Sequence, residues 1–190
     1  MHVLCDTCSV LMLIRIAPDM FTDGRFECVT VKEVCEEIFR TTRFKMKYPW
    51  RVDYKNKILP STLLKGKDDD YDLNLKTIEQ LLEVGKTSEK TGRSFGLSFV
   101  DTKIAAYVTT YGLEISSTDN SLIDFLQQEF DKENRSPLAI LNLWIEKGLV
   151  PWNEDLRKII EDWDKNGEPA QPAKDKRAFL KLTGAKYIGP

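Results

Sequence analysis

Short apolar runs alternate along the first two thirds of the chain with segments whose apolar residues recur at helical spacing. The apolar runs predict strands over residues 2–6, 26–30 and 113–118. The helical spacing predicts helices over residues 10–16, 30–38, 73–84, 98–112 and 122–130, with a charged loop at 67–72 before the third helix. Strands that alternate with helices in this way predict an α/β fold with a mainly parallel sheet.

Capping signals define several helix ends. Thr30 is followed three residues later by Glu33, and Ser98 by Asp101, which predicts a capping box at the start of each helix. Pro18 ends the first helix near residue 17, because the residue before a proline disfavours helical geometry.

The last third of the chain reads differently. Ser136 followed by proline predicts a helix to residue 147, and Asn153 caps another over residues 154–165. From residue 166 the Pro, Ala and Lys content favours an extended or disordered arm that becomes ordered on binding a partner. We therefore expect one domain over residues 1–150, with a basic insert at about 40–75, and a C-terminal helix and arm over 151–190.

Composition excludes several classes of protein. The chain has 190 residues, 42% of them hydrophobic and 31% charged, which is typical of a globular protein. His2 is the only histidine, so a two-histidine ribonuclease, a Ser-His-Asp hydrolase and a His-rich zinc site are hard to build. No run is long enough to span a membrane, no basic leader precedes the first apolar run, and four cysteines read as reduced thiols, which favours a cytoplasmic location.

Acids fall where the predicted elements would bring them together. Asp6 and Asp119 end predicted strands. Asp101 lies in the first turn of its helix, and Glu37 about one turn into its own. Ligands bind at the carboxyl ends of parallel strands, and two carboxylates about 5 Å apart repel by roughly 3 kcal/mol at an effective dielectric near 20. A cluster that stays ionised needs a cation, and oxygen ligands indicate Mg²⁺ or Mn²⁺. The plainer interpretation is that Asp6 is a loop or cap residue and that Asp101 only caps its helix.

Motifs along residues 2–130 resemble those of PIN-domain nucleases. The sequence VLCDTCSVL at residues 3–11 resembles the family's opening strand, acid and threonine. The sequence TVKEVCEEI at residues 30–38 resembles its second motif, whose register selects Glu37 over Glu33 and Glu36 as the metal-site acid. The sequences LSFVD at 97–101 and STDN at 117–120, followed by Asp124, resemble the third and fourth motifs.

This resemblance implies a three-layer α/β/α PIN-like fold and hydrolysis of RNA to 5′-phosphate and 3′-hydroxyl ends. It implies that one or two Mg²⁺ or Mn²⁺ ions are held by acids, with hydroxyl and amide residues in support: Asp6, Glu37, Asp101, Asp119 and Asp124, supported by Thr7, Ser98, Thr118 and Asn120. The pattern is closest to the ribosomal-RNA-maturation branch, without its zinc ribbon, and longer than the compact toxin members. Cys8 departs from the family, many members of which have Asn or Ser there.

Basic residues interleaved with aromatic residues dominate positions 40–57. Lys and Arg with Phe, Tyr and Trp are typical of a surface that follows a phosphate backbone and stacks bases. The candidate RNA-binding residues are Arg40, Arg43, Lys45, Lys47, Arg51 and Lys55. The alternative is that this segment is only a solvated face.

We therefore predict a metal-dependent endoribonuclease in which a metal-activated water attacks a phosphodiester of single-stranded or looped RNA. A non-catalytic PIN-like RNA-binding or scaffold protein, and a structure-specific DNA nuclease, are the alternatives. A homodimer and a regulatory protein partner both stay open, as does the choice between RNA processing and a toxin role. No membrane partner is expected.

Overall fold

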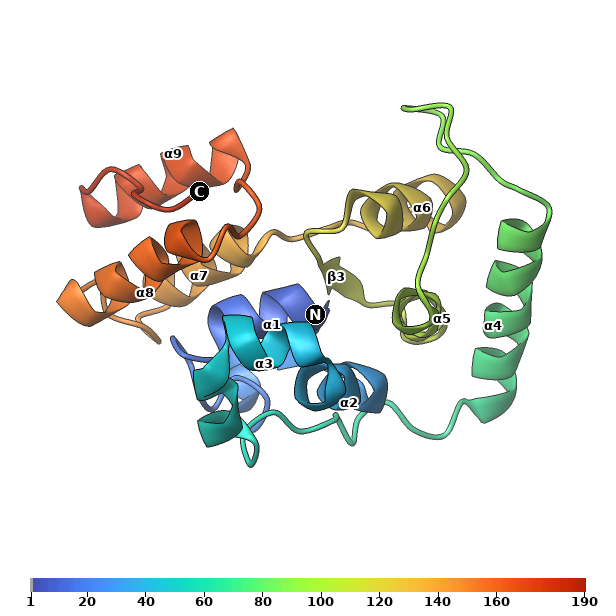
Figure 1. Cartoon of the computed structure of the whole chain (residues 1–190), viewed down its shortest axis with the longest axis horizontal. Coiled ribbons are helices and arrows are strands. Elements are labelled where there is room, and N and C mark those ends of the chain that lie inside the picture. Colours follow the sequence, from blue (N-terminus) through green and yellow to red (C-terminus); the bar gives the residue numbers. More distant parts are fainter. Residues whose placement is uncertain (1) are drawn as a thin grey trace.

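A small parallel sheet lies at the centre of the computed structural model, which describes residues 2–190 (Figure 1). Its strands are β1 (Val3–Cys5), β2 (Cys28–Val29) and β3 (Glu114–Ser116), in the order β2-β1-β3. Leu4 of the central strand pairs with Val29 on one side and Ile115 on the other. The predicted α/β class and parallel sheet are confirmed, and the arrangement is compatible with α/β/α layers.

Helices make up most of the rest of the described chain. They are α1 (Thr7–Leu13), α2 (Lys32–Arg40), α3 (Thr42–Lys47), α4 (Asp68–Glu83), α5 (Phe99–Tyr111), α6 (Asn120–Phe130), α7 (Pro137–Glu146), α8 (Glu154–Lys165) and α9 (Ala173–Thr183). Two short 3-10 turns, η1 (Gly24–Phe26) and η2 (Pro49–Tyr54), connect them. No helix within residues 2–190 combines the length and apolar character that a membrane crossing requires.

Side-chain caps begin several of these helices as predicted. Ser98 and Asp101 form a reciprocal capping box at α5. Ser136 accepts a hydrogen bond from the Ala139 amide at α7, and Asn153 accepts one from the Leu156 amide at α8. These caps satisfy amides that have no partner inside the helix.

The predicted capping box at Thr30 is wrong. Val31, which has no side-chain cap, precedes α2, and the Thr30 hydroxyl donates to the Cys5 carbonyl at 3.1 Å instead. Thr30 is fully buried, so its hydroxyl must find a partner in the interior, and the end of β1 provides one.

Three helices begin earlier than predicted, among them α6, which begins at Asn120 because Asp119 caps it. α1 begins at Thr7, because the Asp6 carboxylate accepts a hydrogen bond from the Ser9 amide at 2.7 Å and caps the helix there. α4 begins at Asp68, within the predicted charged loop, where acidic residues stabilise the positive end of the helix dipole.

The predicted extended arm contains a packed helix. α9 lies against α7, and Phe179 and Tyr187 are buried (Figure 1). The Ser136 hydroxyl donates to the Asp175 carboxylate at 2.7 Å, and the Asn142 amide donates to the Asp175 carbonyl at 2.9 Å. The apolar residues Phe179 and Tyr187, which are unusual for a linker, pack within the chain itself and need no separate partner.

Candidate acidic site

The carboxyl ends of the strands meet at one edge of the sheet, with Asp6 at its middle. The Asp6 amide donates to the Ser116 carbonyl of β3 at 3.0 Å. On the other side the Thr30 hydroxyl, which follows β2, binds the Cys5 carbonyl. Hydrogen bonds from both neighbours therefore fix the backbone around Asp6.

The Asp6 side chain is buried, only 5% exposed, among neutral donors. One carboxylate oxygen accepts from the Ser9 amide at 2.7 Å and the other from the Ser117 hydroxyl at 2.6 Å. Burial raises the pKa of Asp6 to about 6, although these hydrogen bonds lower it, and the charge of Asp101 adds a smaller increase. Asp6 and Asp101 therefore lie within electrostatic range of each other.

Glu37 of α2 is held beside Asp6 through Thr7. The Thr7 hydroxyl donates a very short hydrogen bond to the Glu37 carboxylate. Glu36 instead forms ion pairs on the surface of its own helix. One carboxylate oxygen of Glu33 is buried with no hydrogen-bond partner among the described residues. Of the three acids on α2, Glu37 is the one linked to the residue next to Asp6.

Asp119 joins the edge through Ser117. The Asp119 amide donates to the Ser117 hydroxyl at 3.0 Å, and the same hydroxyl donates to Asp6. The Asp119 carboxylate caps α6 by accepting from the amides of Ser121 and Leu122, at 2.7 and 3.1 Å. The sequence placed Ser117 in the STDN motif but gave it no role of its own, because its hydrogen bond to Asp6 joins residues 111 positions apart.

The Asp101 carboxylate caps α5 and also acts on the charge of Asp6. One of its carboxylate oxygens, Oδ2, accepts from both the amide and the hydroxyl of Ser98, at 3.1 and 2.7 Å. Because the capping box uses a single oxygen, Oδ1 is left for another ligand.

No Lys or Arg side chain in the described part of the chain forms an ion pair with Asp6, Glu37, Asp101 or Asp119. Asp124 differs, because Lys90, from the segment between α4 and α5, pairs with its carboxylate. Across residues 2–190 no three His, Cys, Asp or Glu side chains already form a metal-coordinating group, so the acids are neighbours linked largely through hydroxyls.

Of the predicted supporting residues that follow β3, Thr118 is half-buried and Asn120 is exposed. Thr118 donates to the thiol of Cys8 in the first turn of α1. Burial, together with the charge of Asp6, raises the pKa of Cys8 to about 12, so this thiol stays protonated at neutral pH. Asn120 is exposed as the first residue of α6.

The candidate RNA-binding residues are unequal. Arg51 is buried, 5% exposed, and its guanidinium donates to the carbonyls of Ile38 and Tyr48 at 3.0 and 3.2 Å. It therefore holds η2 against α2 and does not face solvent, so its predicted RNA contact is replaced by this internal role. Arg40 is exposed but paired with Glu36 at 3.0 Å. Exposed positions without a carboxylate partner in residues 2–190 are Arg43, Lys45 and Lys55.

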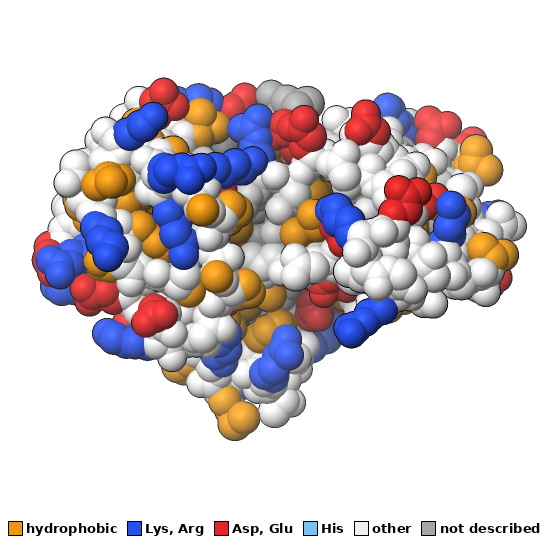
Figure 2. Space-filling view, turned by 90° about the horizontal axis from the view of Figure 1, so that it is seen from above, with side chains coloured by type: hydrophobic (Ala, Val, Ile, Leu, Met, Phe, Trp, Pro, Cys, Tyr) orange, Lys and Arg blue, Asp and Glu red, His pale blue; other side chains and the backbone are white. Residues whose placement is uncertain are grey.

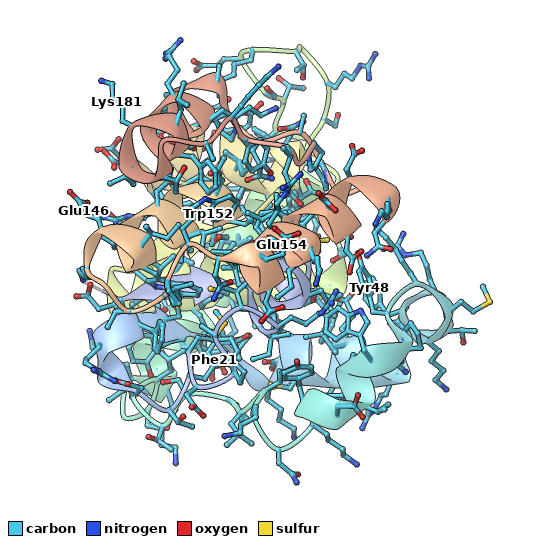
Figure 3. All side chains as sticks on the ribbon, turned by 90° about the vertical axis from the view of Figure 1, so that its left-hand side faces the viewer. Phe21, Tyr48, Glu146, Trp152, Glu154 and Lys181 are labelled. Atoms are coloured by element: carbon cyan, nitrogen blue, oxygen red, sulfur yellow. The ribbon has the colours of Figure 1, made fainter. Side chains whose placement is uncertain are left out.

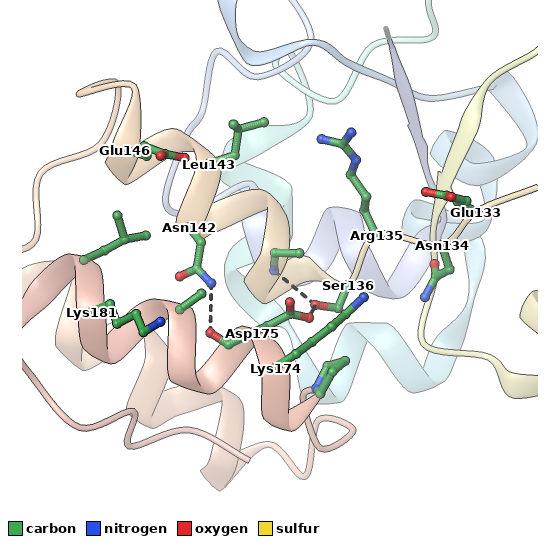
Figure 4. A pocket seen from close by; sticks show the side chains of 14 residues that line it. Glu133, Asn134, Arg135, Ser136, Asn142, Leu143, Glu146, Lys174, Asp175 and Lys181 are labelled. Atoms are coloured by element: carbon green, nitrogen blue, oxygen red, sulfur yellow. Dashed lines mark hydrogen bonds between the residues drawn. The ribbon is translucent and has the colours of Figure 1, made fainter.

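A hollow of about 700 Å³ lies away from these acids, between α7 and α9 (Figure 4). Asn142 and Asp175 are among its lining residues, together with other acidic and basic side chains. α9 exposes Lys174, Arg177 and Lys181, and Lys and Arg side chains gather over that part of the molecule in Figure 2.

Comparison of the chain with protein-family models, with curated proteins and with solved structures found no match.

Proposed function

We propose that the protein is a metal-dependent endoribonuclease with a PIN-like fold. The observation that carries this proposal is the buried Asp6 at the carboxyl end of the central strand, joined through Thr7 to Glu37 and through Ser117 to Asp119. Asp101 is close enough to raise the pKa of Asp6.

Uncompensated carboxylates of this kind suit a divalent cation. Asp6 is buried yet has only hydroxyl and amide donors, so in the metal-free protein its charged form is disfavoured. Oxygen ligands favour Mg²⁺ or Mn²⁺, which Asp6, Glu37, Asp101 and Asp119 would hold. Such an ion, when bound, lowers the pKa of a coordinated water and stabilises charge that develops on the phosphate.

The chain's own residues fix the carboxylates in advance. Ser9 and Ser117 hold both oxygens of Asp6, and Thr7 holds Glu37. Ser98 binds one carboxylate oxygen of Asp101, and the other oxygen is left for a ligand. Fixed ligands reduce the reorganisation that binding requires, which is the general use of hydrogen bonds around a catalytic group.

A single-stranded or looped RNA is the substrate that we propose, with exposed cations of the segment 40–57 along its path. The four cysteines are free thiols, which fits a reducing compartment such as the cytoplasm. Non-catalytic RNA binding is an alternative outcome of the test below, and a DNA strand of the same sequence assayed beside the RNA distinguishes the DNA nuclease.

The test measures Mn²⁺ binding and cleavage of a 5′-labelled single-stranded RNA side by side. We expect cleavage with Mg²⁺ or Mn²⁺ and none in excess EDTA. Glu37→Gln should abolish it, whereas Glu36→Gln, a matched change one residue away on the surface, should leave it unchanged. Cleavage in EDTA, or near wild-type turnover by Glu37→Gln, would contradict the proposal. Mn²⁺ and RNA binding without cleavage would favour the non-catalytic alternative.

A further inference from the structure

Glu168, between α8 and α9, has a buried side-chain carboxylate. Its side chain is 2% exposed, and it forms an ion pair with Lys47 of α3 at 3.0 Å. It also accepts a very short hydrogen bond from the Tyr48 hydroxyl. Because a buried carboxylate needs compensation, this pair strongly constrains where the Lys47 ammonium lies.

Lys47 nevertheless remains accessible to solvent. Its side chain is 31% exposed, and the ammonium lies 4.9 Å from the centre of the Tyr48 ring. An ammonium has three donors, and Glu168 needs only one of them. A further donor is therefore free to bind an anion from solvent without breaking the internal pair.

This cluster borders the acidic site. Tyr48 lies where the α3 region meets the C-terminal helices (Figure 3). The Arg51 guanidinium donates to the carbonyls of both Tyr48 and Ile38, at 3.2 and 3.0 Å, so the backbone next to Lys47 is fixed against the helix that carries Glu37. Ile38 directly follows Glu37 in α2, so the Lys47–Glu168 pair lies next to the part of α2 that contributes to the acidic site.

We propose that Lys47, fixed by Glu168 and Tyr48, binds a backbone phosphate of single-stranded RNA beside the acidic site. Glu168 is then a positioning residue, through which the C-terminal segment sets a substrate contact. The physical reason is that clustered carboxylates repel a phosphate chain, and a fixed cation at their rim offsets that repulsion. This inference rests on the proposed nuclease function and names a substrate contact for that site.

A double-mutant comparison separates RNA binding from folding. Lys47→Met leaves Glu168 unpaired and should lower both the Tm and the affinity for RNA. Lys47→Met combined with Glu168→Gln removes both charges and keeps an acceptor for Tyr48, so it should regain the Tm of the wild type. Its RNA binding should stay weak, with the slope of log affinity against log salt reduced by roughly 0.7. Lys158→Met, a change to an exposed lysine on α8, is the matched control and should leave the slope unchanged.

RNA binding is measured by fluorescence anisotropy in EDTA over a series of KCl concentrations, so that it does not depend on cleavage. Mn²⁺ affinity is measured separately. A double variant with wild-type RNA affinity and slope would overturn the inference and leave the pair a structural one. A wild-type protein that neither cleaves RNA nor binds Mn²⁺ would contradict the proposed nuclease. The salt dependence of RNA affinity would still test whether Lys47 binds a phosphate. Wild-type protein without salt-dependent RNA binding would overturn the phosphate contact itself.

Discussion

Asp6 has two tasks whose requirements differ. As the cap of α1 it needs only an oxygen that accepts from the Ser9 amide, which a neutral side chain also supplies. As a metal ligand it must be charged while buried, and burial disfavours the charge. Asparagine at this position would keep the first task and remove the second.

This difference makes the stability of the metal-free protein depend on pH. The pKa of Asp6 is about 6, above its ordinary 3.8, so the folded chain holds the proton more tightly than the unfolded chain does. The resulting stabilisation is complete below about pH 4 and is lost as the pH rises through about 6. The difference corresponds to about 3 kcal/mol. In thermal melts with EDTA, Asp6→Asn should therefore gain stability relative to the wild type between pH 4 and pH 7.5.

Added Mn²⁺ should reverse this order at pH 7.5, because only the wild type supplies the carboxylate and binding stabilises the folded state by mass action. An Asp6→Asn variant whose Tm relative to the wild type is the same at pH 4 and pH 7.5 would contradict the burial argument.

Asp101 allows capping and metal binding to be separated by substitution. Asp101→Asn keeps an oxygen for Ser98 and removes one charge from a repelling group, so we expect abolished cleavage with unchanged or higher Tm. Ser98→Ala removes the cap, which costs about 1 kcal/mol, and should lower activity only in part, because Asp101 keeps its charge. If Asp101 serves only as a cap, Asp101→Asn will keep its turnover and lose stability.

At the scale of elements, local chemistry predicted the helix starts that depend on neighbouring residues. Ser98, Ser136 and Asn153 each cap the helix that follows. The sequence predicts these caps because each hydrogen bond joins residues only three positions apart. The capping box predicted at Thr30 is wrong because the Thr30 hydroxyl binds the carbonyl of Cys5 in another strand. Only the sheet topology brings those two together, and no local pattern contains it.

The segment over α3 and η2 shows the same limit for charge. Its composition correctly marks it as basic, but it does not tell which cations reach solvent. We expect Arg43, Lys45 and Lys55, changed together to Gln, to weaken RNA binding without lowering the Tm. The salt slope should fall by up to roughly 0.7 for each phosphate that these side chains neutralise in the wild type.

Arg51→Met is the matched comparison for that experiment. Because its guanidinium binds two buried carbonyls, this change should lower the Tm and leave the salt slope as it is. An unchanged slope in the triple variant would return the segment to a solvated face.

At the scale of the molecule, the candidate site draws on residues from both ends of the α/β region. The strand-end rule placed Asp6 and Asp119 at one edge, and the spacing within α2 allowed Glu37 to join them. The hydroxyl of Ser117 that links two of the acids, and the pairing of Asp124 with Lys90, depend on contacts between distant segments. Their roles could be assigned only from the folded chain.

The C-terminal segment tests whether the chain folds as one body. Phe179 is fully buried, and Glu168 and Asp175 bind residues of α3 and the start of α7. A segment that orders only on binding could be removed without cost, whereas this one fills part of the core. Deleting residues 168–190 should therefore lower the Tm sharply, and Phe179→Ala alone should cost about 3–5 kcal/mol in denaturant unfolding. Lys181→Gln on the exposed face of α9 is the control and should change stability little. A deletion variant with the wild-type Tm would show instead that α9 is a separable appendage. It would also show that the region around Lys47 folds without Glu168.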